Sequence, residues 1–111
     1  MRILLDECLP ARLRRELPGH TVTTVPLAGW ASIKNGKLLR LIAESGNFDV
    51  FITMDKNLPH QQRSKNLPFA VVVLRAKSNR FEDTHLLMPE VLRRLPGFLA
   101  GRTYFVSKVK V

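Results

Sequence analysis

The stretch Met1-Arg-Ile-Leu-Leu-Asp-Glu-Cys-Leu-Pro10 places a short apolar run directly before two carboxylates. We interpret residues 3–5 as a strand that delivers these acids to the carboxyl edge of a sheet. A second apolar run, Asp49-Val-Phe-Ile-Thr-Met-Asp55, ends in the same way. The carboxyl edge is where ligands bind in open α/β sheets. If the two strands are adjacent and parallel, Asp6 and Asp55 come within reach of one cation.

Strands and helices are expected to alternate along the whole chain. Apolar and β-branched runs predict strands, and apolar residues recurring every three or four positions predict helices. We expect strands at 3–5, 20–25, 48–53, 69–74 and 103–106. We expect helices after Pro10, over 36–45 with Asn35 as N-cap, from Pro59 to Arg63, and from a capping box at Asn79 and Glu82 to Leu95, with a kink or restart at Pro89. This alternation predicts one α/β domain over residues 1–111, with a mainly parallel sheet of about five strands flanked by helices.

The chain is strongly basic, with 18 Lys and Arg against 9 Asp and Glu and a formal net charge of +9. This balance favours a polyanionic partner, although solvated charges on a basic domain can also serve solubility alone. Acids at predicted strand ends shift the interpretation toward a nucleic-acid enzyme. We expect phosphate contacts around the acids from Lys34, Lys37, Arg40, Lys56 and Arg63.

The single cysteine, Cys8, excludes an internal disulfide and is typical of a reducing cytoplasm. No His lies near it in the sequence, so we interpret it as a packed residue rather than a nucleophile. The apolar run at residues 1–5 is too short for a signal peptide, and no stretch approaches the ~18 residues of a membrane span. We therefore expect a cytoplasmic protein with no membrane partner, and leave a homodimer open.

Asp6 and Asp55 are the residue type that hard cations prefer. Mg²⁺ is usually held by one or two carboxylates together with the substrate phosphate. A bound metal polarises the phosphate and lowers the pKa of an attacking water, so no His base is required. Either Asp alone could instead be the N-cap of a following helix. The pair at matching strand ends favours the metal.

These segments resemble the PIN-like nucleases, in particular the short stand-alone kind often linked to toxin–antitoxin pairs. The resemblance covers about the first 75 residues and rests on Ile3-Leu-Leu-Asp-Glu-Cys-Leu-Pro10, Gly29-Trp-Ala-Ser-Ile-Lys-Asn-Gly-Lys-Leu-Leu39 and Phe51-Ile-Thr-Met-Asp-Lys-Asn57. It implies a PIN-like α/β fold, cleavage of RNA with Mg²⁺ or Mn²⁺, and a small antitoxin partner. Asp6 matches the family's first-strand acid and Asp55 the Asp of its Thr-x-Asp motif, which implies that both are catalytic metal ligands.

The chain departs from the family at two positions. PIN-like nucleases usually carry an acid at the start of the middle helix, where this chain has Asn35, and often another two residues after Thr-x-Asp, where it has Asn57. Glu7 and Asn57 are candidate substitute ligands, and Asn35 is grouped with the substrate-binding cations. The two neutral amides keep a second interpretation open, a PIN-like module that binds RNA or an antitoxin with weak or no catalysis.

A third interpretation is a receiver-like phosphoacceptor domain. Receivers also carry acids after strand one, an Asp after strand three and a Lys after strand five, which Asp6, Asp55 and Lys108 imitate. Against this interpretation, the fourth predicted strand ends in Leu74-Arg-Ala76, where a receiver has Thr or Ser. The net positive charge also suits nucleic acid better.

Overall fold

The structure is a computed structural model that describes residues 1–57 and 67–108 of the 111 in the chain. The expected helix from Pro59 to Arg63, and the cation Arg63 with it, lies outside the described residues. The strands are β1 (Arg2–Leu5), β2 (Thr21–Thr24), β3 (Val50–Thr53), β4 (Ala70–Arg75) and β5 (Thr103–Ser107). The helices are η1 (Ala11–Glu16), α1 (Asn35–Ser45), α3 (Phe81–Thr84), η3 (His85–Leu87), α4 (Met88–Arg94) and η4 (Leu95–Gly97).

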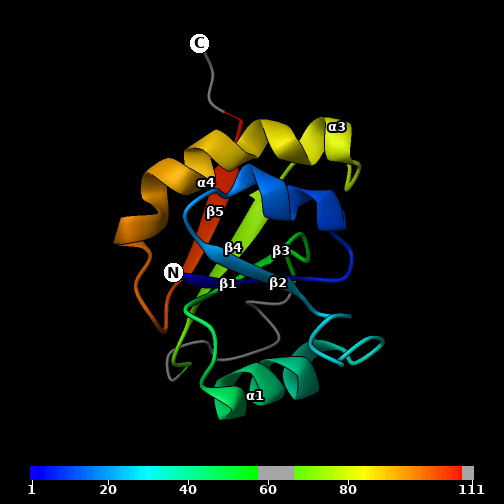
Figure 1. The fold of residues 1–111 in the computed structure, drawn as a ribbon, viewed down its shortest axis with the longest axis vertical. Helices are drawn as coiled ribbons and strands as arrows, with labels where there is room; N and C mark the ends of the chain where they lie inside the picture. Colours follow the sequence, from blue (N-terminus) through cyan, green and yellow to red (C-terminus); the bar gives the residue numbers. More distant parts are fainter. Residues whose placement is uncertain (58–66, 109–111) are drawn as a thin grey trace.

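All five strands join one parallel sheet in the order β2-β1-β3-β4-β5, which confirms the predicted fold class. The chain leaves β1 for β2 in one direction and then crosses back to β3 on the other side of β1. Right-handed crossovers in opposite directions must pass over opposite faces of the sheet. In agreement, α1 lies on one face, while η1, α3 and α4 lie on the other (Figure 1).

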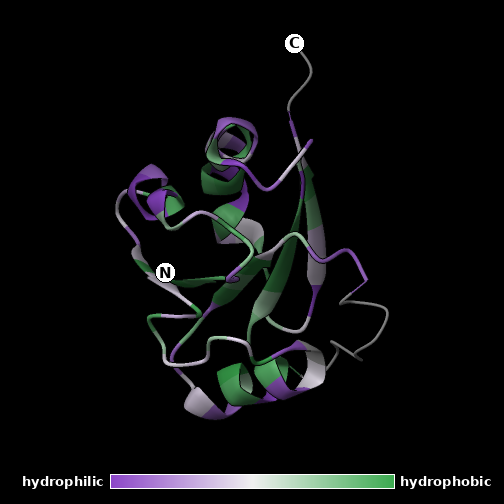
Figure 2. Ribbon diagram, turned by 90° about the vertical axis from the view of Figure 1, so that its right-hand side faces the viewer, coloured by the Kyte–Doolittle hydropathy of each residue, from purple (hydrophilic) through white to green (hydrophobic). Residues whose placement is uncertain are grey.

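Two apolar cores fill the spaces between the sheet and the helical layers, because successive strand residues point to opposite faces. Ile3 and Ile52 belong to the core under η1 and α4, whereas Leu4 and Phe51 belong to the core under α1. Each of the four residues of β3 is fully buried, as the doubly apolar run predicts. Figure 2 shows this apolar layer along the strands, with helices of mixed polarity on either side.

The helix starts differ from the predictions in detail. The N-cap of α1 is Lys34 and Asn35 is already helical, so the predicted cap is wrong by one residue. The predicted capping box of Asn79 and Glu82 is also wrong, because Arg80 is the N-cap of α3. The Asn79 side chain instead donates to the main-chain carbonyl of Cys8 at 3.0 Å. A contact distant in sequence has therefore replaced the expected local one.

The first and last helical segments are shorter or more broken than a regular α-helix. The segment after Pro10 is a 3₁₀-helix, η1, yet its expected apolar residue Leu13 is fully buried. The restart expected at Pro89 is confirmed, because α4 begins at Met88 and carries Pro89 in its first turn. In the first turn an N–H has no carbonyl partner within the helix, so proline, which lacks the N–H, loses no hydrogen bond there. Within the described ranges, no helix has both the length and the apolar character needed to cross a bilayer.

Candidate active site

The strand order places the carboxyl ends of β1 and β3 at a topological switch point. The connection from β1 and the connection to β3 pass over opposite faces, and in open α/β sheets such a point is where ligands bind. Asp6 directly follows β1, and Asp55 follows β3 after one intervening residue. The adjacency that the sequence prediction required is therefore present. Both acids are half-buried.

The register of β1 against β3 is tied at the opposite, amino end of the two strands. The Arg2 N–H donates to Asp49 Oδ2 at 2.8 Å, and the Asp49 N–H donates to the Arg2 carbonyl at 2.8 Å. The Arg2 guanidinium also lies 3.2 Å from Asp49 Oδ1. Hydrogen bonds from the Arg2 side chain and main chain, and the charge of its guanidinium, lower the pKa of Asp49. The carboxylate thus stays ionised at neutral pH and holds this register.

A buried hydroxyl connects the two acids. Leu5 stands beside Ile52 in the sheet, so Asp6 and Thr53 form the next pair. Thr53 Oγ1 donates to Asp6 Oδ2 at 2.6 Å and accepts from the main-chain N–H of Asp55 at 3.1 Å. Thr53 is fully buried, so this hydroxyl has little access to water. It holds the Asp6 carboxylate on one side and the start of the Asp55 loop on the other.

Strand periodicity directs this group to the face that carries α1. Asp6 follows Leu4 by two residues, and Thr53 and Asp55 follow Phe51 by two and four, so both series continue the face of the α1 core. The two acids line one pocket of about 190 Å³, together with residues from the loop before α1 and from α1 itself. The described residues lining it are Asp6, Glu7, Cys8, Ile33, Lys34, Leu38, Phe51 and Asp55.

Glu7 lines the same pocket but also has a structural contact. Its two carboxylate oxygens accept the main-chain N–H of Ser32 at 3.1 and 3.3 Å. Ser32 has φ of 68°, a left-handed conformation that is uncommon for a non-glycine residue. The same loop is anchored by Trp30, which packs edge-to-face on Phe48 with ring centroids 6.1 Å apart. Glu7 therefore ties the loop before α1 to the end of β1.

The predicted substrate-binding cations separate into two groups. Lys34 lines the pocket of the two acids, and Lys37 and Arg40 lie exposed on α1. Lys56 lines a neighbouring pocket of about 450 Å³ with Arg75 at the end of β4.

Asn35 and Asn57, the two neutral residues singled out in the sequence, lie at the start of α1 and in the turn after β3. Asn35 begins α1. Asn57 is exposed, and its main-chain N–H donates to Asp55 Oδ1 at 3.0 Å. This bond fixes one oxygen of Asp55 in the turn that leaves β3.

Thr53, whose hydroxyl joins the two acids, and Cys8, which lines the pocket, were not among the predicted site residues. The signal for Thr53 was its position two residues before Asp55, which gives both the same face of the sheet. Cys8 is exposed as a residue, yet partial burial of its sulfur raises the pKa of the thiol. The neighbouring charge of Asp6 and its hydrogen bond raise this pKa further, partly offset by hydrogen bonds with Met54 and Thr53.

The donor set of the two acids fits a hard cation that is also bound by substrate. Asp6 Oδ1 accepts the Glu7 N–H at 2.8 Å, and Asp55 Oδ2 accepts no hydrogen bond from the described residues. A carboxylate oxygen has about two lone pairs, so both acids retain capacity for a metal. Within the described ranges, no three His, Cys, Asp or Glu residues gather into a group that could hold a metal ion. Two carboxylates alone would leave most of the coordination sphere of a Mg²⁺ or Mn²⁺ ion to water or phosphate oxygens.

Comparison with known proteins gives no further guide to the site: no protein-family model, curated protein or solved structure matches the chain.

Replacing Thr53 by Val should destabilise the protein by about 1–3 kcal/mol, because the change leaves Asp6 Oδ2 and the Asp55 N–H without their buried partner. Urea unfolding measures the loss. The control is Thr21→Val on the exposed part of β2, which should stay within about 0.5 kcal/mol of wild type. Equal unfolding midpoints for all three proteins would contradict the role of the hydroxyl.

Replacing Asp6 by Asn should lower the pKa of Cys8, because a negative charge next to a thiol disfavours the thiolate. The pH profile of iodoacetamide alkylation reports this value directly, since Cys8 is the only cysteine. Its midpoint should move to lower pH in Asp6→Asn. Glu44→Gln is the control, because Glu44 is exposed on α1, about 15 Å along the helix from Lys34. If the midpoint moves in both variants, or in neither, the charge of Asp6 does not raise the pKa of Cys8 as expected.

Proposed function

We propose that the protein is a metal-dependent ribonuclease of the PIN-like type. The observation that carries the proposal is the meeting of Asp6 and Asp55 in one pocket at the switch point between β1 and β3, with Thr53 hydrogen-bonded to both residues. The net charge of +9 supports a polyanionic substrate. The resemblance of the segments around these two acids to PIN-like nucleases supports RNA as that substrate.

In this proposal the chain binds a cation and positions a phosphate, and it supplies no His or Cys base. Asp6 and Asp55 would hold Mg²⁺ or Mn²⁺, and the bound ion supplies a polarised phosphate and a water of lowered pKa. Thr53 keeps the Asp6 carboxylate oriented by its 2.6 Å hydrogen bond. Lys34, in the same pocket, is placed to contact a phosphate oxygen. Glu7 holds the loop that carries Ser32 against the site.

The resemblance further suggests the toxin of a toxin–antitoxin pair. The partner would then be a small antitoxin that covers the acid pocket and blocks access of RNA. Lys37 and Arg40, exposed on the helix beside the pocket, are suited to contact either an RNA backbone or an acidic antitoxin segment.

A second candidate function is a PIN-like module that binds RNA or an antitoxin without cleaving RNA. It is favoured by the small number of acids, because the described residues gather no group of three metal-binding side chains. Asn57 is exposed where the resembled family often has another acid. Binding of RNA without cleavage in either Mg²⁺ or Mn²⁺ would select this candidate.

The receiver-like alternative shares the strand order, since receiver domains also follow the order 2-1-3-4-5. It is disfavoured at the end of β4, where the chain has Arg75 in place of the Thr or Ser of a receiver. Lys108 follows β5 and is exposed, and in the described ranges no ion pair joins it to Asp55. Incubation with acetyl phosphate separates the two, because a receiver gains a phosphoryl group on Asp55 and a nuclease does not.

Asp55→Asn should abolish RNA cleavage in Mg²⁺ or Mn²⁺ while leaving the fold intact, because the amide removes one of two charged metal ligands. Cleavage of a labelled RNA is measured on gels, and circular dichroism checks the fold. Glu44→Gln is the matched control, since it removes one exposed carboxylate from α1 outside the pocket. If wild type and Asp55→Asn degrade RNA equally, the activity belongs to a contaminant or to another site.

Asn57→Asp should lower the melting temperature without metal and increase the stabilisation by Mn²⁺. Residue 57 already contacts Asp55 through its main chain at 3.0 Å, so an added carboxylate would repel the acids when no cation is present. A third charged ligand would then bind the cation more tightly, and ligand binding to the native state stabilises it. Thermal melts with and without Mn²⁺ measure both effects. Identical metal-induced shifts in the two proteins would place residue 57 outside the metal site.

A further inference from the structure

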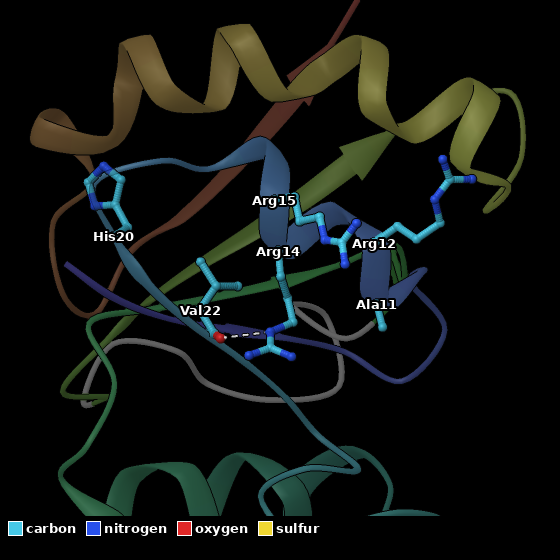
Figure 3. A pocket seen from close by; sticks show the side chains of 6 residues that line it. All are labelled: Ala11, Arg12, Arg14, Arg15, His20 and Val22. Atoms are coloured by element: carbon cyan, nitrogen blue, oxygen red, sulfur yellow. Dashed lines mark hydrogen bonds between the residues drawn. The ribbon is translucent and has the colours of Figure 1, made fainter.

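A second, strongly cationic groove lies on the other side of β1, between η1 and the edge strand β2. It has a volume of about 680 Å³. Its described lining residues, drawn in Figure 3, are Ala11, Arg12, Arg14, Arg15, His20 and Val22, and none of them is acidic. The one acid of η1, Glu16, is directed to η3, where it lies 3.7 Å from His85. The groove therefore concentrates positive charge, and no carboxylate of the described residues lines it.

The three arginines are exposed but differ in how firmly they are held. The Arg12 guanidinium stacks on Phe81 at 4.0 Å from the ring centroid, and Figure 3 shows it extending toward α3. Arg14 reaches β2, where its Nε donates to the Val22 carbonyl at 3.1 Å. Arg15 makes no side-chain hydrogen bond or ion pair within the described ranges. Arg14 thus presents an anchored guanidinium whose terminal nitrogens remain available, beside the unengaged guanidinium of Arg15.

The edge of β2 determines which kind of anion the groove can accept. In a parallel pair, alternate residues direct their main-chain groups outward, and Thr21 and Val25 bond inward to β1. The outward carbonyls are then those of Val22 and Thr24. Val22 accepts from Arg14, and Thr24 accepts from the Ala28 N–H at 3.0 Å. Because both carbonyls already accept a hydrogen bond, an acidic peptide that added as a further strand would compete with Arg14 at Val22 and with Ala28 at Thr24, whereas phosphate oxygens need only donors.

We propose that this groove is a second binding site for the phosphodiester backbone of RNA, with Arg14 and Arg15 donating to phosphate oxygens. Guanidinium groups suit this role, because their planar fork matches two phosphate oxygens. The groove also lies close to the acids in the chain: Ala11 follows Asp6 by five residues, so their Cα atoms are at most about 18 Å apart. The inference rests on the proposed function in taking RNA as the ligand, but it does not require cleavage.

The test is binding of a labelled oligouridylate in EDTA, measured over a series of salt concentrations. Arg15→Gln should weaken binding and lower the magnitude of the salt slope by about 0.7, the value for one lost phosphate contact on a single strand. The matched control is Arg102→Gln, because Arg102 is exposed just before β5, the opposite edge strand. This variant removes the same charge and should leave the slope at the wild-type value.

Three results would overturn the proposal. Equal slopes for Arg15→Gln and wild type, or equal losses in both variants, would show that the groove makes no contact of its own with RNA. Polyglutamate is tested as a competitor of oligouridylate at equal charge concentration. If it competes for wild type but not for Arg15→Gln, the groove binds an acidic protein segment instead of RNA. RNA cleavage by Arg15→Gln in Mg²⁺ or Mn²⁺ is measured in a separate assay. A failure of the proposed RNA binding in the groove can therefore be told apart from a failure of the proposed nuclease activity.

Discussion

The alignment of β1 with β3 is the constraint on which the candidate site depends. Side chains in a strand alternate between the two faces of the sheet. If β1 slipped by one residue against β3, Asp6 and Asp55 would point to opposite faces. The main chains of Arg2 and Asp49 bond at one end, and the Thr53 hydroxyl contacts Asp6 at the other. Three fully buried residues of β3, Val50, Phe51 and Ile52, lie between these two ends. The apolar core and the polar contacts at both ends thus specify the same register.

Thr53 explains how charged groups are tolerated at the end of a fully buried strand. A buried hydroxyl without a partner costs free energy, and so does a carboxylate that loses water without gaining a donor. The contacts of Thr53 avoid both costs, because its hydroxyl donates to Asp6 and accepts from the main-chain N–H of Asp55. In the described ranges, no buried side-chain nitrogen or oxygen lacks a hydrogen-bond partner. The Asp6 carboxylate and the start of the Asp55 loop are therefore held in place by hydrogen bonds within the protein itself.

The two charged regions of the molecule differ in how their charges are balanced. Around the pocket of Asp6 and Asp55, acids and the cation Lys34 occur together, an arrangement suited to a metal and a phosphate. Along the groove of η1 and β2, Arg12, Arg14 and Arg15 face no described carboxylate, an arrangement suited to anions alone. Both lie next to β1 but on different sides of it, because the chain leaves β1 on one face and returns to β3 over the other.

Much of the fold was predictable from the sequence because its signals are local. Short apolar runs such as Val50 to Thr53 favour buried strands, and their alternation with helices favours crossovers and a parallel sheet. Pro89 marked the restart of the last helix for the equally local reason that proline lacks an N–H. Predictions failed where a distant contact outweighed the local pattern, as at Asn79, whose side chain bonds Cys8 rather than capping α3.

The sequence by itself determined that two strands end in Asp6 and Asp55, that the chain is basic, and that residues 50–53 must be buried. Only the tertiary structure decided that β1 and β3 are neighbours, that Thr53 joins the two acids, and that Glu7 holds Ser32. It also decided that the arginines of η1 share a groove with β2. The physical reason is that hydrophobic burial and strand propensity act between residues close in the chain, whereas strand order and side-chain hydrogen bonds depend on residues brought together by folding.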